Sequence, residues 1–465
     1  MRTLSLRVLV LAVLAASCLV VPAAAAGTTV TIPVGPAPAT PKAYDKVFVT
    51  KYGPASAKKV LVLVPGTIGG AGDFALLGPE LARRVPGLQV WALDRREQAL
   101  EDGSRMQQAL DGSISVQQAF DYYLGWILDP SIAPHYQARQ AKDFTFMKNW
   151  GMKVNMDDLR RVILNAKRGG GGRTVILGGH SLGASFAAGY AAWDFGGRPG
   201  YKDIAGVVAI DGGLLGSFDS ITTADQATAA LARLDVTPTN PDGPWANLLQ
   251  LPGFAWTTGA FAQLGALAAL KAPSARSAFQ DFALLPAQFK PPVPATNEGL
   301  LGYAFDATTS PAALSLIQVR AGQLAPAGDP RPWQDGEVTP IQNLARGFGS
   351  GRVDGVDWYY PLRLNVDTDA ASPMSATPAA KLLGLRLKWL SKVDIPYYAF
   401  QTSLTGARNG VVNGAKAFAR RSKVPKGRLV VVDGKATTSH LDPLFAAPAT
   451  NQFLKTVVPF LKRIR

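Results

Sequence analysis

The most constraining feature of this sequence is a serine between two glycines, at the junction of an expected strand and an expected helix. The apolar, β-branched residues 174–177 predict a buried strand, and the Ala-rich segment 184–195 predicts a helix packed on a sheet. Between them lies G-H-S-L-G, residues 179–183. In this context G-x-S-x-G is typical of a nucleophile elbow, where strained backbone at the serine leaves room only for glycine two residues away. We therefore expect Ser181 to project from the carboxyl edge of a sheet.

Strands and helices alternate on both sides of this motif. Several of the strand segments are continuous apolar runs, as strands covered on both faces require. This alternation predicts a parallel sheet with helices on both faces. The expected strands, besides 174–177, are residues 44–52, 58–64, 88–93, 204–210, 395–404 and 428–433.

With these motifs the chain resembles the α/β-hydrolase superfamily, and within it the secreted esterases and lipases. The resemblance covers residues 47–211 and 395–465. It implies an α/β-hydrolase fold with a mainly parallel central sheet flanked by helices and a large, mostly helical cap inserted after the sixth strand. It also implies a carboxylic ester hydrolase that works through an acyl-enzyme.

The composition along the chain predicts four parts. Residues 1–26 read as a signal peptide, and residues 27–213 as the first part of the core, with a leader of low order at 27–42 and a helical flap at 97–150. In residues 214–391 proline, alanine and aromatics dominate and the strand-helix rhythm is lost, so this segment is the expected cap. Residues 392–465 form the second part of the core.

The N-terminal segment predicts export. Arg2 and Arg7 precede an apolar run over residues 8–21, which is followed by proline and alanines. This pattern is typical of a secretory signal, with an uncleaved membrane anchor as the alternative. The single cysteine, Cys18, lies in this segment. We therefore expect a secreted protein, extracellular or in the cell envelope, without disulfides.

A nucleophilic serine needs a general base, and the sequence holds only three histidines. His440 follows the last expected strand, at the same edge as Ser181, and is the expected base. His180 lies inside the elbow, where packing or support of the site is the expected role, and His135 lies in the flap.

The acid of the expected triad is less well determined. The resemblance implies an aspartate after the seventh strand, but the matching turn, residues 406–412, has Asn409 in its place. Asp211, at the end of the expected strand 204–210, is where a minority of lipases in this superfamily carry it, and it is the first candidate. Asp433, Asn409 itself as a neutral partner, and an acid from the cap are the alternatives.

Two backbone N–H groups should form an oxyanion hole. Leu182 supplies one at the start of the helix, and Thr67 is expected to supply the other, with Ile68 second, from the glycine-rich loop 65–70. That loop lacks the G-K-[ST] of a phosphate-binding loop. No spacing of His, Cys or carboxylates predicts a metal, and no cofactor is expected.

The net charge and its distribution along the chain bear on which charged partners the protein attracts. The formal net charge is +15, but the basic residues are scattered rather than clustered as nucleic-acid binding would require. A loose attraction to an acidic cell envelope or polymer is expected instead. The aromatic cap favours lipid, aryl or polyester-like esters. A secreted serine peptidase and a non-catalytic envelope-binding protein are the alternative functions, and the oligomeric state stays open.

Overall fold

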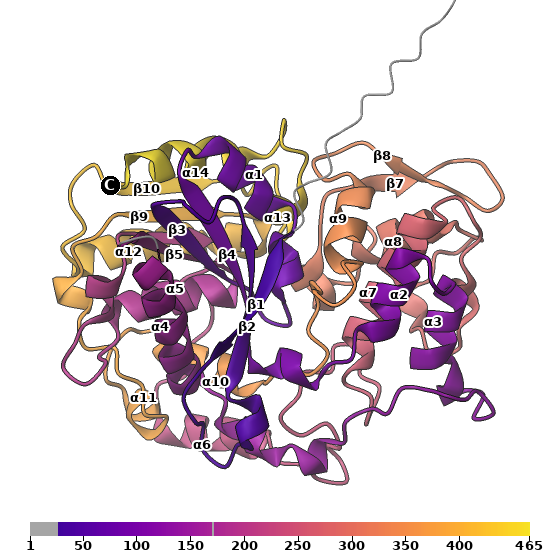
Figure 1. The fold of residues 1–465 in the computed structure, drawn as a ribbon, viewed down its shortest axis with the longest axis horizontal. Coiled ribbons are helices and arrows are strands. Elements are labelled where there is room, and N and C mark those ends of the chain that lie inside the picture. Colours follow the sequence, from indigo (N-terminus) through magenta and orange to yellow (C-terminus); the bar gives the residue numbers. More distant parts are fainter. Residues whose placement is uncertain (1–26, 170–171) are drawn as a thin grey trace, which may run out of the picture.

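The computed structural model describes residues 27–169 and 172–465, and the predicted signal peptide lies outside these ranges. A single eight-stranded sheet organises the chain, with strand order β1-β2-β4-β3-β5-β6-β9-β10 (Figure 1). Six strands run parallel: β4, β3, β5, β6, β9 and β10. β1 and β2 are antiparallel to their neighbours. The predicted mainly parallel sheet is thereby confirmed. Its strands are β1 (Thr28–Pro33), β2 (Lys46–Tyr52), β3 (Lys59–Val64), β4 (Leu88–Asp94), β5 (Thr174–His180), β6 (Val207–Ile210), β9 (Tyr397–Gln401) and β10 (Leu429–Asp433).

The prediction of a leader of low order at residues 27–42 is wrong in its first part. Thr28–Pro33 forms β1, an edge strand that pairs with all but the last residue of β2. Only Ile32 of this strand is fully buried, so its sequence carries little of the apolar signal that marks a strand. Pro33 is tolerated because it ends an edge strand.

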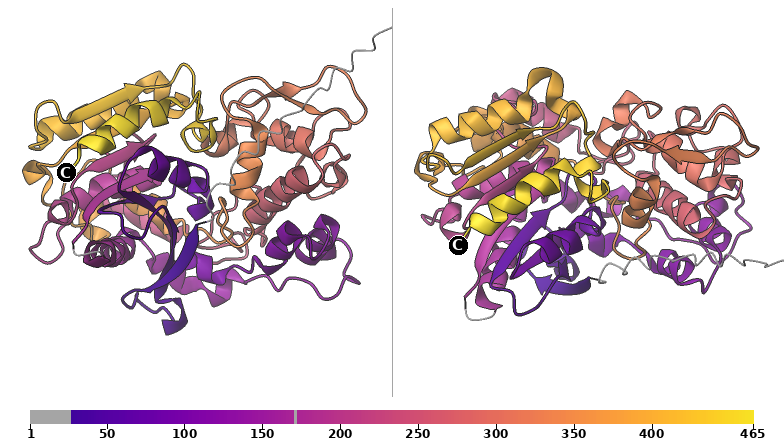
Figure 2. Two further views of the ribbon diagram at one scale, coloured as in Figure 1. Left: turned by 45° about the horizontal axis from the view of Figure 1, so that its top comes forward. Right: turned by 90° about the horizontal axis from the view of Figure 1, so that it is seen from above.

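Helices cover both faces of the sheet. One face carries α1 (Leu77–Arg84) and α14 (Gln452–Arg463), which touch each other, and the other carries α4 (Met152–Arg168), α5 (Leu182–Ala192) and α12 (Gly410–Arg421) (Figures 1 and 2). All of α5 is buried, because it lies between the sheet and α10 (Arg363–Ala371). The segment that carries the elbow is thus held in the centre of the molecule.

Residues 214–391 fall into two groups. The helices α6 (Ala224–Ala232), α10 and α11 (Pro378–Leu382) pack together, and α10 also contacts α4 and α5. The remaining elements pack with the helices of the predicted flap into what we call the side lobe, beside the sheet (Figure 2). The side lobe comprises α2 (Ser104–Asp111), α3 (Val116–Tyr123), α7 (Thr257–Lys271), α8 (Asn297–Phe305), α9 (Ile341–Phe348), β7 (Gly322–Leu324) and β8 (Trp333–Asp335).

The side lobe has an aromatic core of its own. Tyr136, Trp256 and Trp358 contact one another within it, edge to face or tilted. Tyr136 belongs to the predicted flap, and Trp256 and Trp358 belong to residues 214–391. The flap and the middle of residues 214–391 therefore share one core. Within the described ranges, none of the helices combines the length and apolar character needed to cross a bilayer.

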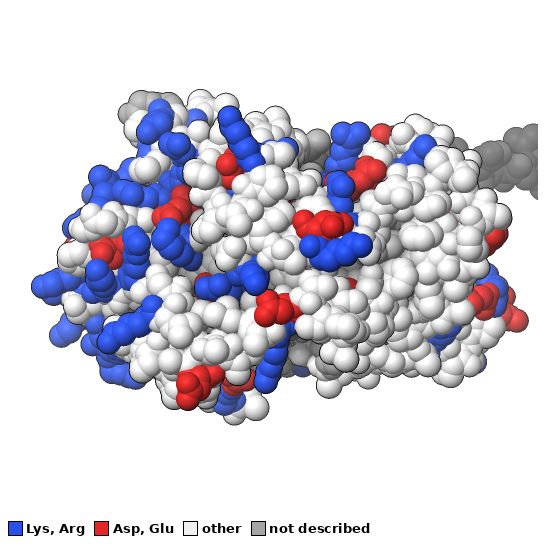
Figure 3. All heavy atoms as spheres, turned by 90° about the horizontal axis from the view of Figure 1, so that it is seen from below, with Lys and Arg blue, Asp and Glu red and all other residues white. Residues whose placement is uncertain are grey.

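The surface charge is uneven. On the face shown in Figure 3, Lys and Arg gather over the end of the molecule that carries the sheet, whereas the end formed by the side lobe is mostly uncharged. The basic side chains spread over a broad area rather than forming a narrow stripe.

Candidate active site

Strand β5 runs into helix α5 through Ser181, whose backbone lies in a region that L-residues rarely adopt (φ 54°, ψ −122°). The Ser181 N–H donates to the Ile210 carbonyl at 2.8 Å, which ties the turn to β6. A Cβ on Gly179 would lie 2.3 Å from the Gly183 carbonyl group, and one on Gly183 would lie 2.0 Å from the Val64 carbonyl oxygen. Glycine is therefore required at both positions, as expected of a nucleophile elbow.

His440 and Asp211 meet above the same edge of the sheet. Asp211 directly follows β6, and His440 lies in the loop between β10 and α13 (Asp442–Phe445). The two residues are joined by a hydrogen bond of 2.5 Å between His440 Nδ1 and Asp211 Oδ2, and both side chains are buried. The Asp211 carboxylate also accepts the backbone N–H of Thr402 at 2.7 Å and the Thr402 hydroxyl. These bonds fix the carboxylate against the imidazole.

Ser181 and His440 line one small pocket, together with Thr67, Ile317 and Phe348. Nδ1 of His440 is engaged by Asp211, and its other ring nitrogen, Nε2, is buried without a hydrogen-bond partner among the described residues. Bonds between catalytic groups are commonly long or absent before substrate binds. The pocket is therefore lined by Ser181 and by an imidazole whose Nε2 has no hydrogen-bond partner among the described residues.

His180 lies beside His440 and is bonded to its backbone. A hydrogen bond of 2.9 Å joins His180 Nε2 to the His440 carbonyl oxygen, and the two rings lie 4.3 Å apart. Because a carbonyl only accepts, His180 Nε2 carries the hydrogen. Burial, with His440 beside it, lowers the pKa of His180 well below its usual value, so this ring stays neutral. The contact agrees with the supporting role expected from the sequence.

The other candidate acids and bases lie elsewhere. Asp433 contacts Gln401 and Lys435, and Asn409 contacts the same two side chains. His135 stacks on Trp126 in the side lobe, with ring centroids 4.4 Å apart. Of the residues named as candidate partners for His440, it is Asp211 that contacts the imidazole ring.

No family model and no curated protein matches the sequence. Solved structures of similar fold include a candidate lipase from Sulfolobus solfataricus (15% identity, 94% of each chain covered, TM-score 0.46). They also include Epoxide Hydrolase A from Mycobacterium thermoresistibile, at 13% identity, with 94% of this chain and 99% of that chain covered and a TM-score of 0.43.

The assignment of the fold rests on the sheet itself. Parallel strands in the order β4-β3-β5-β6-β9-β10, an antiparallel β2 beside them and a serine elbow directly after β5 occur together here. This chain has the α/β-hydrolase fold. Its sequence order of serine, aspartate and histidine is also the order that this fold uses for a catalytic triad.

In the α/β-hydrolase fold the oxyanion donors come from the residue after the serine and from the loop after β3. Leu182 is the first residue of α5, where a backbone N–H has no acceptor in its own helix. Thr67 lies in the loop after β3 and lines the pocket of Ser181. Both residues are therefore placed beside the serine.

A buried arginine that the sequence did not indicate holds the Thr67 loop. Arg95 donates to the carbonyl oxygens of Pro65 at 2.5 Å, Gly66 at 2.8 Å and Gly69 at 3.3 Å. Its guanidinium also contacts the Asp357 carboxylate at 3.3 Å. Arg95 comes directly after β4, so its position at the end of a strand was the one signal available for it.

The loop that carries His440 is tied to the side lobe by Asp442. The Asp442 carboxylate accepts the N–H of Ser439 at 2.6 Å, the N–H of Arg320 at 3.0 Å and the hydroxyl of Thr339 at 2.7 Å. Burial raises the pKa of Asp442 to about 6. The position of His440 thus depends on residues that lie far from it in the sequence.

Carboxyl groups gather behind the Thr67 loop. Glu101, Asp354 and Asp357 bring oxygen atoms within 4.8 Å of one another. Burial raises the pKa of Asp354 to about 6 and the pKa values of Glu101 and Asp357 well above their usual range. After burial, the nearby Asp354 carboxyl is a further cause of the raised pKa of Glu101. Oxygen donors also suit hard cations, and the backbone N–H of Trp358 donates to the Glu101 carboxylate at 2.7 Å.

Proposed function

We propose that this chain is a serine hydrolase that cleaves carboxylic esters through an acyl-enzyme. One observation carries the proposal: the buried imidazole of His440 lines the same pocket as Ser181, with Nδ1 bonded to Asp211 and with no partner for Nε2 among the described residues. This arrangement suits a base that takes a proton from a serine hydroxyl.

In the proposed reaction, His440 Nε2 takes the proton of Ser181 as Oγ attacks the ester carbonyl carbon. The N–H groups of Leu182 and Thr67 stabilise the oxyanion, and Asp211 stabilises the imidazolium. The imidazolium then gives its proton to the leaving alcohol. Water, activated by the same histidine, releases the acid from Ser181.

The N-terminal segment supports the further proposal that the protein is secreted. Its charged start, apolar run and alanines suit a secretory signal. Mass spectrometry of the exported protein would test this, because cleavage near residue 26 is the expected outcome and an intact N-terminus would contradict it.

The test of the activity is hydrolysis of nitrophenyl acetate by the wild type and by Ser181→Ala. The variant should lose on the order of 10⁴- to 10⁶-fold in kcat. Ser113→Ala, at an exposed serine, is the matched control and should behave as the wild type. Equal turnover by the Ser181 variant would refute the proposal, and a preference for amide over ester substrates would assign a peptidase instead.

A further inference from the structure

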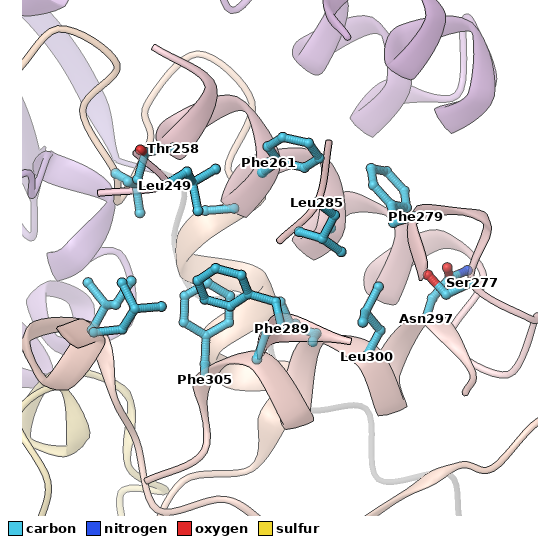
Figure 4. Close-up of a pocket in the computed structure, with 17 residues that line it drawn as sticks. Leu249, Thr258, Phe261, Ser277, Phe279, Leu285, Phe289, Asn297, Leu300 and Phe305 are labelled. Atoms are coloured by element: carbon cyan, nitrogen blue, oxygen red, sulfur yellow. The ribbon is translucent and has the colours of Figure 1, made fainter. Parts of the chain in front are cut away.

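A second cavity lies inside the side lobe, next to the pocket of Ser181. The centre of a water-sized sphere can move through about 70 Å³ of it, several times the space that one water molecule needs. Most of its 17 lining residues are aliphatic or aromatic, and Phe261, Phe289 and Leu300 are among them (Figure 4). An apolar ligand would therefore gain from leaving water here.

The cavity and the pocket of Ser181 share a wall. Ile317 lines both of them. Phe305 of the cavity packs edge to face on Phe348 of the pocket, with ring centroids 5.4 Å apart. Side chains separate the two spaces at these positions. An unbranched chain would need the smallest opening between them.

Two hydroxyl groups of the cavity lining have no partner. Thr258 Oγ1 and Ser277 Oγ are buried and make no hydrogen bond among the described residues. Figure 4 shows Thr258 and Ser277 on opposite sides of the cavity. Unpaired buried hydroxyls are rare in an interior that is packed for stability alone. They indicate a space that takes up a ligand or water.

We propose that this cavity holds the aliphatic acyl chain of the ester whose carbonyl group lies at Ser181. This inference rests on the proposed function. The reacting group would lie in the small pocket, and a chain that extends past Ile317 would enter the larger cavity. The substrate class is thus esters of unbranched aliphatic acids rather than acetyl or compact aryl esters.

Helix α7 offers a position at which the cavity can be filled. Thr258, Phe261, Ala262 and Gly265 line the cavity from one face of this helix, at the spacing of successive turns. A Cβ on Gly265 would meet no atom within 4 Å, so a larger side chain there can enter the cavity. Gly336, which follows β8 and lines no part of the cavity, also has open space around its Cβ and serves as the control.

The experiment compares kcat/KM for nitrophenyl esters from acetate to dodecanoate. In the wild type we expect a rise with chain length, at most about four-fold per methylene. Gly265→Phe should lower the ratio of decanoate to acetate at least ten-fold, Gly265→Ala should lower it far less, and Gly336→Phe should leave it as in the wild type. A flat series, or an unchanged ratio in Gly265→Phe, would overturn the inference and leave the proposed function standing.

A binding measurement separates the two proposals. Ser181→Ala is titrated with a fluorescent long-chain fatty acid, and Ser181→Ala/Gly265→Phe serves as the comparison. Saturable binding that weakens at least ten-fold in the double variant supports the cavity, even if the wild type hydrolyses no ester and the proposed function fails. Absence of binding, or equal binding by both proteins, would overturn the inference.

Discussion

Nδ1 of His440 lies 2.5 Å from Oδ2 of Asp211, although 229 residues separate the two in the chain. The order of the strands in the sheet explains why these two side chains are in contact. β6, β9 and β10 are consecutive neighbours in the sheet and run parallel, so the residues that follow β6 and β10 emerge at one edge. Thr402, directly after β9, lies between these two strands and holds the Asp211 carboxylate.

The first prediction concerns the identity of the acid. Asp211→Asn should lower kcat for ester hydrolysis on the order of 10⁴-fold, because an amide cannot stabilise the imidazolium and favours the wrong tautomer. Asp433→Asn should stay within a few-fold of the wild type, since Asp433 contacts Gln401 and Lys435 instead of the histidine. Steady-state kinetics on nitrophenyl acetate measures both. Loss of kcat in the Asp433 variant alone would assign the role of the triad acid to Asp433 instead of Asp211.

The second prediction concerns the elbow. Gly183→Ala should destabilise the protein by about 1–3 kcal/mol, because the new Cβ would collide with the Val64 carbonyl oxygen. Gly336→Ala, where a Cβ meets open space, is the matched control and should have little effect. Urea unfolding followed by circular dichroism compares the two. Equal urea midpoints for Gly183→Ala and Gly336→Ala would show that the close contact between β3 and α5 is absent.

A third prediction tests the support of the Thr67 loop. Arg95→Lys should lower kcat/KM for esters on the order of 10²-fold, since one ammonium group cannot replace the guanidinium on three carbonyl oxygens. Arg346→Lys, at an exposed arginine, should have no such effect. Kinetics alongside a circular dichroism spectrum separates misplacement of the loop from unfolding. Wild-type rates in Arg95→Lys would contradict the proposed support.

The fourth prediction is a pH dependence of stability. The pKa of Asp354 is raised from 3.8 to about 6, so between these values the native state binds more protons than the unfolded chain. This contribution to stability is fully present below pH 3.8 and is lost as pH rises through 6. Asn mimics the protonated acid, so Asp354→Asn should unfold at higher urea than the wild type at pH 8 and lose this advantage near pH 4. A constant difference across this range would contradict the account.

Much of the sheet could be predicted because its inner strands β4, β3, β5, β6 and β9 are buried on both faces. β3 and β5 read as apolar runs, and the glycines around Ser181 mark the turn between β5 and α5. β1 was not predicted, because an edge strand with one fully buried side chain carries a weak apolar pattern.

The supporting residues of the site were harder to predict. Arg95, Thr402 and Asp442 act through contacts with residues distant in the sequence. The only local signal was the position of Arg95 and Thr402 directly after a strand. The partner of His440 could be narrowed to a few candidates, but choosing among them needed the neighbour relation of β6, β9 and β10. The shared core of the predicted flap and residues 214–391 likewise arises only from tertiary packing.

If His440 activates Ser181, a fluorophosphonate should label Ser181 covalently, at a rate that depends on the imidazole. After reaction, peptide mass spectrometry locates the modified residue, and the labelling rate is compared between the wild type and His440→Ala. We expect one phosphonylated residue, Ser181, and a labelling rate at least about 10²-fold lower without the imidazole. An unlabelled Ser181, or an equal rate in the two proteins, would contradict this activation.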